Sequence, residues 1–270
     1  MAKLPIVFSD VDGTIYERDA YVSNFNLSVI KQDNLSFNIA TGNPICPRML
    51  KLAKLTNADY IIGSSGVQIY DYQNKKFVYE KYLNPEIVQE IFDLIKKYNV
   101  SAAAWSSEVF YVFREQDKEF LNKLYFRAEN FDWATIYDPN QPLKPIAKIE
   151  VYFEDTNNVD LLIEELKKVE VKTIITHMNV EIISFQASKG RGIYWLLENI
   201  FQGTSPDEVM VVGDSENDFS MFKRFYHSYV MDNAKEEVKE RANNVTKTVT
   251  EHGLGYAILD YIAKLNGNLE

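Results

Sequence analysis

The sequence contains very little cysteine, because Cys46 is the only one among its 270 residues. A single cysteine excludes an intrachain disulfide and a thiolate metal cluster. Cys46 lies in a segment flanked by prolines, where we expect it to be a small apolar side chain. The fold and any metal site of this protein must therefore form without cysteine cross-links or thiolate clusters.

The sequence also lacks long apolar runs and has fewer basic than acidic residues. No run approaches the roughly 18 residues of a membrane span, and the N-terminus lacks the basic and apolar regions of a signal peptide. The 39 acidic residues outnumber the 29 basic ones, for a formal net charge of −10. This excess argues against a nucleic-acid or acidic-membrane surface. We expect a cytoplasmic protein with neither partner, and no pattern indicates an oligomeric state.

Hydrophobic residues, by contrast, make up 46% of the chain, enough to bury a large core. Strands alternate with helices in residues 1–82 and again in 186–270, which predicts one Rossmann-like parallel sheet and an α/β fold. Residues 83–185 read as helix, two strands, helix, strand, helix and two strands. This order predicts an α+β domain inserted into the α/β core.

Two aspartates, Asp10 and Asp12, follow an apolar run at residues 6–8 that we expect to be a buried parallel strand. Two carboxylates about 4 Å apart repel by roughly 4 kcal/mol at an effective dielectric of about 20, which a bound cation would relieve. Gly13 permits a sharp turn, and Thr14 places a hydroxyl and an N–H group on it. Asp-x-Asp-Gly also occurs in ordinary turns and calcium loops, so this stretch alone leaves both interpretations open.

Polar groups also mark two other positions near predicted strand ends. Thr41 and Gly42 close a predicted strand at residues 37–40, an arrangement found in phosphate sites and also in ordinary turns. Lys189 begins a predicted helix. A lysine facing clustered carboxylates would neutralise charge and hold a phosphoryl group, and a solvated surface lysine is the alternative.

The strongest pattern is the segment at residues 213–218, which follows a predicted buried strand at 209–212 and carries Asp214, Asn217 and Asp218. Three acid or amide side chains so near a buried strand are not needed to form the strand or its turn, so they indicate a functional site. Ligands of open α/β sheets lie at the carboxyl ends of strands, so we expect these groups to meet the two aspartates of the first motif. Carboxylate, carbonyl and water oxygens are the ligands of Mg²⁺, while the lack of histidine and thiolate here disfavours zinc.

The ordered motifs D-x-D-G-T, T-G, K-G and G-D-x-x-N-D resemble the four motifs of the haloacid dehalogenase superfamily of phosphatases. The insertion between the second and third motifs resembles the Cof-type branch, which has an α/β cap. The motifs span Asp10 to Asp218, and the resemblance covers nearly the whole chain. It implies a haloacid dehalogenase fold, Mg²⁺ as cofactor, and hydrolysis of a small phosphate ester through an aspartyl phosphate.

The resemblance also implies a role for each matching residue. Asp10 is the implied nucleophile, and Asp12 is the implied general acid and then base, with its backbone carbonyl on the metal. The implied catalytic residues are Asp10, Asp12, Thr41 and Lys189. The implied substrate-binding residues are Thr41, Gly42, Asn43, Lys189 and Asn217. The implied metal ligands are Asp10, Asp12, Asp214 and Asp218, the last through water.

Two departures from the family pattern bear on these roles. Asn43 stands where many relatives carry an arginine directly after Thr-Gly. Arg48, about one helical turn further on, is a possible substitute, although we expect a surface arginine. The turn Ser64-Ser65-Gly66 lacks the asparagine often found before that glycine.

Several alternatives stay open at this stage. The expected substrate is a sugar phosphate or a phosphorylated cofactor, and the hairpin tips at residues 105–108 and 177–179 are the candidate specificity positions. Packing is the alternative role for Trp105, and a simple turn is the alternative for His177. The alternative functions are a phosphomutase, in which Asp10 passes its phosphoryl group to a sugar, and a catalytically silent metabolite-binding module.

Overall fold

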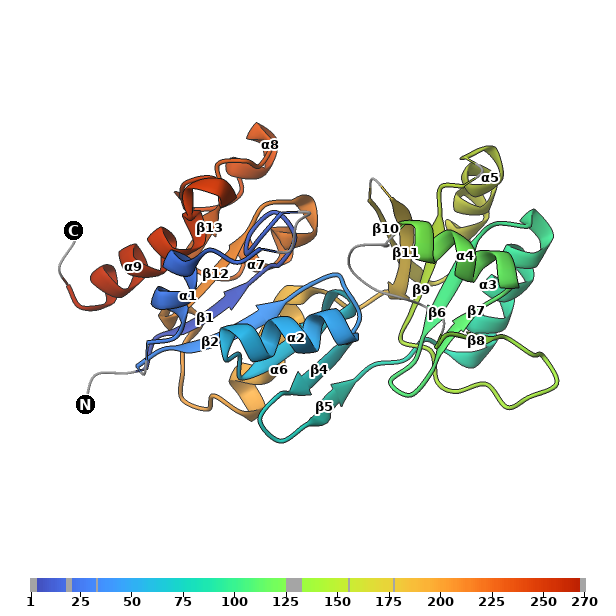
Figure 1. Cartoon of the computed structure of the whole chain (residues 1–270), viewed down its shortest axis with the longest axis horizontal. Helices are drawn as coiled ribbons and strands as arrows, with labels where there is room; N and C mark the ends of the chain where they lie inside the picture. Colours follow the sequence, from blue (N-terminus) through green and yellow to red (C-terminus); the bar gives the residue numbers. More distant parts are fainter. Residues whose placement is uncertain are drawn as a thin grey trace. The chain divides into compact units, whose positions relative to one another are not determined.

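The computed structural model describes residues 4–17, 21–32, 34–124, 133–154, 156–176 and 178–267. The chain forms two compact units (Figure 1). The core unit comprises Met1–Val78 and Ser188–Glu270, and the inserted unit is Tyr79–Ala187. Within the described ranges, no helix has both the length and the apolar composition of a membrane span.

The core unit is built on a sheet in which eight described strands follow the order β14-β13-β12-β1-β2-β3-β4-β5. The strands from β14 to β3 run parallel, and β4 pairs antiparallel with β3. This arrangement confirms the α/β prediction. The strands are β1 (Ile6–Ser9), β2 (Ser36–Ala40), β3 (Tyr60–Gly63), β4 (Gln68–Asp71), β5 (Lys76–Glu80), β12 (Val209–Gly213), β13 (His227–Val230) and β14 (Asn244–Val245).

Every residue of β1, β2 and β12 is buried, as expected for the centre of a parallel sheet covered on both faces. Two of the flanking helices begin at recognisable start signals. Ser188 accepts a hydrogen bond from the Arg191 N–H at the start of α6, and Pro47 takes the first position of α2. The helices are α1 (Asn24–Ile30), α2 (Pro47–Thr56), α6 (Lys189–Asn199), α7 (Phe219–Phe222), α8 (Glu236–Lys239) and α9 (Gly253–Leu265).

The inserted unit has its own sheet, with described strands in the order β10-β11-β9-β6-β7-β8. Its strands are β6 (Ala102–Trp105), β7 (Phe110–Val112), β8 (Thr135–Ile136), β9 (Lys148–Tyr152), β10 (Val171–Ile175) and β11 (Asn179–Ser184). Its helices are α3 (Pro85–Tyr98), α4 (Glu115–Leu124) and α5 (Thr156–Leu166). The sequence missed β8, since two residues are too short for a periodic pattern. The second helix expected in this unit, at residues 118–128, corresponds to α4 where it is described, and residues 125–128 lie outside the described residues.

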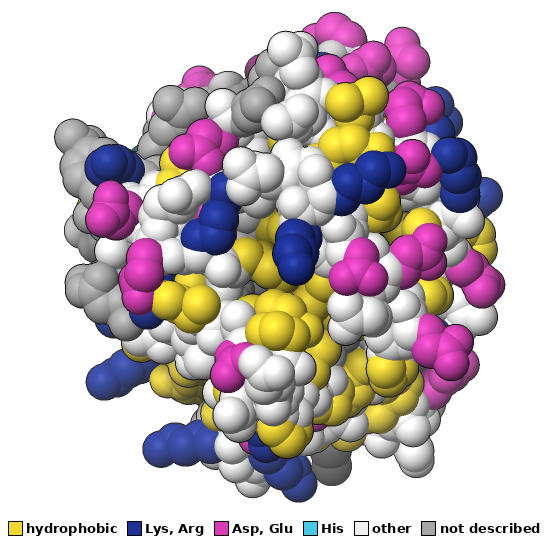
Figure 2. All heavy atoms as spheres, turned by 90° about the vertical axis from the view of Figure 1, so that its right-hand side faces the viewer, with side chains coloured by type: hydrophobic (Ala, Val, Ile, Leu, Met, Phe, Trp, Pro, Cys, Tyr) yellow, Lys and Arg dark blue, Asp and Glu magenta, His cyan; other side chains and the backbone are white. Residues whose placement is uncertain are grey.

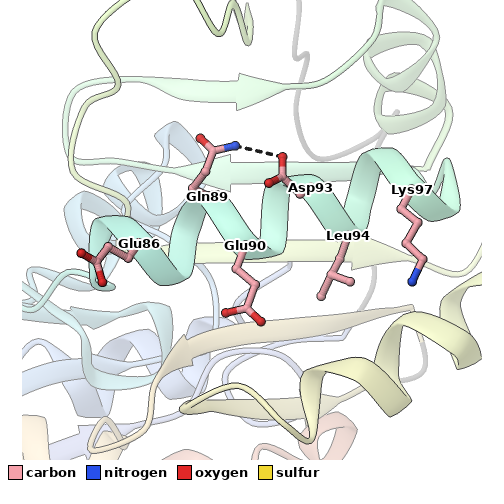
Figure 3. Close-up of a pocket in the computed structure, with 6 residues that line it drawn as sticks. All are labelled: Glu86, Gln89, Glu90, Asp93, Leu94 and Lys97. Carbon is pink, nitrogen blue, oxygen red and sulfur yellow. Dashed lines mark hydrogen bonds between the residues drawn. The ribbon is translucent and has the colours of Figure 1, made fainter.

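Helices α3 and α5 pack together over one face of this sheet and enclose the apolar core of the inserted unit. The opposite side of α3 is polar. Figure 3 shows the six α3 residues that line a pocket on this side, and Gln89 donates a hydrogen bond to Asp93, one turn further along the helix, at 3.0 Å. Because the lining comes from one helix, its polar groups do not converge on a ligand. Figure 2 shows one face of the molecule, on which acidic, basic and apolar side chains are interspersed.

Candidate active site

The predicted motifs meet at the carboxyl edge of the core sheet. Asp10 follows β1, Asp214 follows β12 and Thr41 follows β2, and these three strands are neighbours in the order β12-β1-β2. The Asp10 N–H donates to the Val212 carbonyl at 2.9 Å, which ties the first motif to the end of β12. The parallel topology therefore brings together residues that lie about 200 positions apart in sequence, as open α/β sheets do at their ligand sites.

A buried lysine lies at the centre of the cluster. Lys189 Nζ donates to Asp10 Oδ1 at 2.6 Å, to Asp218 Oδ1 at 2.7 Å and to Asn217 Oδ1 at 3.0 Å. Lys189 is the first residue of α6 and its side chain is fully buried, so the alternative of a solvated surface lysine is wrong. Carboxylate oxygens of Asp10, Asp214 and Asp218 lie within 4.8 Å of one another.

Asp218 also fixes the loop that carries Asp214. Its Oδ2 accepts hydrogen bonds from the N–H groups of Asp214 at 3.0 Å and Ser215 at 3.1 Å. With Lys189 on its other oxygen, Asp218 is engaged on both sides and fully buried. This carboxylate therefore organises the segment after β12 as well as contributing charge to the cluster.

Burial governs the electrostatics of the cluster. It raises the pKa of Asp10 well above its usual range, although the Lys189 ammonium opposes the shift. Burial, with repulsion from Asp218, raises the pKa of Asp214 to about 7. The two carboxylates that Lys189 contacts raise the pKa of this lysine in spite of burial, so it stays charged. One lysine thus leaves excess negative charge among three acidic groups.

Gly13 is required by the close approach of the first motif to the loop after β12. Its φ is +82°, and a Cβ there would lie 2.1 Å from Asp214 Oδ2. Asn233 supports the same turn, because its Nδ2 donates to the Gly13 carbonyl at 3.0 Å and its Oδ1 accepts from the Val249 N–H at 2.9 Å. The sequence analysis missed Asn233, since an isolated asparagine after a strand carries no distinctive signal.

The residues of the cluster fit a hard divalent cation. Asp214 Oδ1 is buried and, within the described residues, has no hydrogen-bond partner. A bound cation would give this buried carboxylate oxygen a partner and would offset the excess negative charge of the cluster. The three side chains offer only carboxylate oxygens as metal ligands, and these suit such an ion better than zinc.

Asp12 lies apart from this cluster. Its Oδ1 accepts from Arg48 Nη1 at 3.0 Å, and its Oδ2 accepts from Asn43 Nδ2 at 2.7 Å. Arg48 also donates to Asn43 Oδ1 at 2.6 Å and to the Tyr16 hydroxyl at 3.1 Å. The Arg48 side chain is only 17% exposed, so the expectation of a surface arginine is wrong. Its partners lie 32 to 36 residues away, or on the far side of a turn, where sequence spacing gives no indication of them.

The second motif is held by the turn after β3. Thr41 is buried, and its Oγ1 accepts from the Asn43 N–H at 3.1 Å. Ser65 N–H donates to the Thr41 carbonyl at 3.0 Å, and Ser64 N–H donates to the Asn43 carbonyl at 2.8 Å. Gly42 lies between these anchored residues in the same loop. The loop predicted to bind phosphate is therefore fixed by backbone hydrogen bonds.

Two residues of the candidate hairpin tips, Trp105 and Asn179, are buried within the inserted unit. Trp105 is 6% exposed, donates to Glu150 Oε2 at 2.8 Å and stacks on Phe110. Asn179 is buried, and its Oδ1 accepts from the Thr176 hydroxyl at 2.7 Å. His177 lies outside the described residues.

A family model described as haloacid dehalogenase-like hydrolase matches residues 7–258. The chain belongs to this family and is a hydrolase, which confirms the resemblance drawn from its four motifs. The match covers both parts of the core unit and the inserted unit between them.

Individual proteins resemble the chain more distantly. The chloroplastic endoribonuclease YBEY of Arabidopsis thaliana is 28% identical over 96% of this chain, which spans only 47% of that protein's length. A 5-amino-6-(5-phospho-D-ribitylamino)uracil phosphatase of Bacillus subtilis (strain 168) is 26% identical, with 96% of each protein covered. A haloacid dehalogenase-like hydrolase from Bacteroides thetaiotaomicron has a TM-score of 0.82 at 23% identity, covering 95% of this chain and 98% of that one, which shows the shared fold.

Proposed function

We propose that this protein is a Mg²⁺-dependent phosphatase that hydrolyses a small phosphate monoester through an aspartyl-phosphate intermediate. The observation that carries the proposal is the position of Lys189, which contacts Asp10 and Asp218 while a buried oxygen of Asp214 lacks a partner. A charged lysine beside a carboxylate nucleophile, together with a buried carboxylate oxygen available to a cation, is an arrangement suited to phosphoryl transfer.

Each residue of the site has a role in this proposal. Asp10 attacks phosphorus, and Lys189 stabilises the charge that the phosphoryl oxygens carry. The Thr41 hydroxyl and the Gly42 N–H bind the same oxygens, and Asn217 orients Lys189, which it contacts. Asp12 protonates the leaving oxygen and then removes a proton from the attacking water.

The bound metal ion would supply positive charge next to the phosphoryl group and lower the repulsion among the carboxylates. Asp10 and Asp214 would hold it directly, together with the backbone carbonyl of Asp12. Asp218 would contact it through water. The raised pKa of Asp214 fits this role, because a ligand that is costly to ionise alone gains most from a cation.

The proposed substrate class is a small phosphate monoester on a sugar, a polyol or a cofactor. The family membership supports a hydrolase, and the relative from Bacillus subtilis is named as a phosphatase of 5-amino-6-(5-phospho-D-ribitylamino)uracil, which is such an ester. The acidic composition also suits a small phosphate ester better than a nucleic acid as substrate. The inserted unit, Tyr79–Ala187, would act as the cap that selects among these esters.

The experiment is steady-state phosphate release from a panel of sugar phosphates, nucleotides and pyridoxal phosphate, with and without Mg²⁺. We expect release that requires Mg²⁺ and that falls by at least about 10³-fold in Asp10→Asn, because this change removes the nucleophile but keeps the shape of the side chain. Transfer of the phosphoryl group to a second sugar without free phosphate would indicate a mutase. A folded protein with no turnover of any ester would contradict the proposal.

A further inference from the structure

Asp12, Asn43 and Arg48 form a closed ring of hydrogen bonds. Both oxygens of the Asp12 carboxylate are engaged, one by the Arg48 guanidinium and one by the Asn43 amide, and these two donors also contact each other. The Asp12 side chain is 56% exposed. An exposed carboxylate ordinarily samples several rotamers, so two donors in fixed positions restrict its orientation.

The two donors are anchored independently of Asp12. Asn43 Nδ2 also donates to Thr41 Oγ1 at 2.9 Å, and the Asn43 carbonyl accepts from the Ser64 N–H. Arg48 lies in the first turn of α2, and its Nη1 also contacts the Tyr16 hydroxyl. The half-buried guanidinium is thus held by the Tyr16 hydroxyl and by Asn43 Oδ1, which accepts from its Nη2 at 2.6 Å. Asp12 therefore takes its orientation from Asn43 and Arg48.

We propose that Arg48, together with Asn43, is a positioning residue that orients the Asp12 carboxylate for proton transfer to the leaving oxygen. The inference rests on the proposed function, in which Asp12 is the general acid and base. In this proposal Arg48 does not touch the phosphoryl group, and it acts on the reaction through its contact with the Asp12 carboxylate.

The leaving group offers a way to isolate this role. A positioned general acid contributes about 10² to 10⁴ in rate, but only where the leaving oxygen needs a proton. Phenolate is a poorer leaving group than p-nitrophenolate, which departs without protonation. Phenyl phosphate and p-nitrophenyl phosphate have nearly the same shape, so a selective loss on the former reports the orientation of Asp12.

The experiment compares the two esters in Arg48→Ala with Mg²⁺ present. We compare kcat/KM, because it reports only the steps up to departure of the leaving group and not the later attack of water, in which Asp12 serves both esters alike. We expect kcat/KM on phenyl phosphate to fall by about 10- to 100-fold, because misplacing a catalytic group by about 1 Å costs this much. On p-nitrophenyl phosphate we expect kcat/KM to fall by about 3-fold or less. Lys51→Ala, at an exposed position of the same helix, is the matched control and should change neither rate.

A second variant keeps the positive charge at position 48. If Arg48→Ala does not fold, Arg48→Lys keeps the charge but loses the planar pair of donors, and we expect the same selective loss.

Equal losses on the two esters would show a general structural role and would overturn the inference. A raised KM with unchanged kcat would show a substrate contact and would overturn it as well. If Asp10→Asn is inactive while Arg48→Ala loses both esters equally, the proposed function stands and the inference alone fails. If the unmodified protein shows no release that depends on Asp10, both fail.

Discussion

Each unit of this protein buries a lysine between two carboxylates. In the core unit Lys189 lies between Asp10 and Asp218, and in the inserted unit Lys148 contacts Glu150 and Glu181. Both lysine side chains are fully buried, and both have donor-acceptor distances of 2.6 to 2.8 Å. The two clusters differ in how the carboxylates are satisfied, and this difference separates a structural ion pair from a reactive one.

In the cluster of the inserted unit, both carboxylate oxygens of Glu150 have donors. Glu150 accepts hydrogen bonds from Trp105 Nε1 at 2.8 Å and from the Tyr152 hydroxyl at 2.7 Å, in addition to its contact with Lys148. Burial opposes ionisation, but Lys148 and these donors outweigh it and lower the pKa of Glu150. Glu150 and Glu181 face each other on paired strands. The cluster therefore exists as stable charges on regular strands.

The cluster of the core unit has too few donors for its charge. Burial raises the pKa of both Asp10 and Asp214 in spite of Lys189, and Asp214 Oδ1 has no partner within the described residues. Ionisation of Asp10 and Asp214 is therefore costly without a counter-ion. A bound cation would lower that cost. The buried carboxylate oxygen of Asp214 that has no donor within the described residues, rather than the presence of a buried ion pair, thus distinguishes the cluster proposed to be catalytic.

Replacing each lysine by methionine tests this comparison and gives the largest expected effects. Lys189→Met should reduce phosphate release by at least about 10³-fold, since it removes the charge beside the nucleophile. Lys148→Met should instead destabilise the protein by about 3 to 5 kcal/mol, because it leaves two buried glutamates uncompensated. Phosphate-release assays and urea denaturation of both variants measure the two effects.

The two variants act as controls for each other. Circular dichroism at low temperature checks that each is folded during the assays. The comparison fails if folded Lys148→Met loses as much activity as Lys189→Met, or if Lys189→Met retains full activity with Mg²⁺.

The contributions of Asp214 and Glu150 to the stability of the protein should change with pH in opposite directions. A raised pKa means that the folded state binds the proton more tightly than the unfolded state does. The stability that protonated Asp214 contributes is therefore present below its ordinary pKa and is lost as the pH rises through about 7. The pKa of Glu150 is lowered, so its contribution is present above its ordinary pKa and is lost as the pH falls through the folded value.

Amide substitutions make this difference measurable. Without Mg²⁺ near pH 8, we expect Asp214→Asn to stabilise the protein by about 2 kcal/mol and Glu150→Gln to destabilise it by a similar amount. Near pH 5 the gain from Asp214→Asn should largely disappear. Added Mg²⁺ should stabilise the unmodified protein near pH 8 but not Asp214→Asn. Thermal denaturation measures all of these shifts, and a destabilising effect of Asp214→Asn near pH 8 without metal would contradict the assignment.

The sequence predicted the reactive cluster much better than the structural one. Asp10, Lys189 and Asp214 belong to short motifs at strand or helix ends, and parallel strand order brings such ends together. Lys148 and Glu150 alternate along an ordinary strand, where the pattern gives no sign that both are buried with Glu181. Arg48 was predicted wrongly for the same reason: its contacts depend on tertiary structure and not on local spacing.

The backbone under the two clusters differs as well, and this leads to the smallest predicted effect. The cluster of the inserted unit lies on regular strands, whereas the loops around Lys189 pack on a turn with two consecutive left-handed residues, Ser64 (φ 49°) and Ser65 (φ 56°). Gly66 completes this turn, and a Cβ there would lie 2.1 Å from the Ser188 carbonyl, directly before Lys189.

Left-handed backbone costs a residue such as serine about 1 kcal/mol, and asparagine adopts it more readily. We therefore expect Ser65→Asn to raise the free energy of unfolding by about 0.5 kcal/mol, measured by urea denaturation. Ser65→Val, with a β-branched side chain that disfavours positive φ, should lower it by more than that. Lys75 is the matched control, because it also has a positive φ (53°) but lies in the exposed turn between β4 and β5. Lys75→Asn should give a similar gain, and if only the exposed site responds, the turn beside Lys189 is not strained by its backbone.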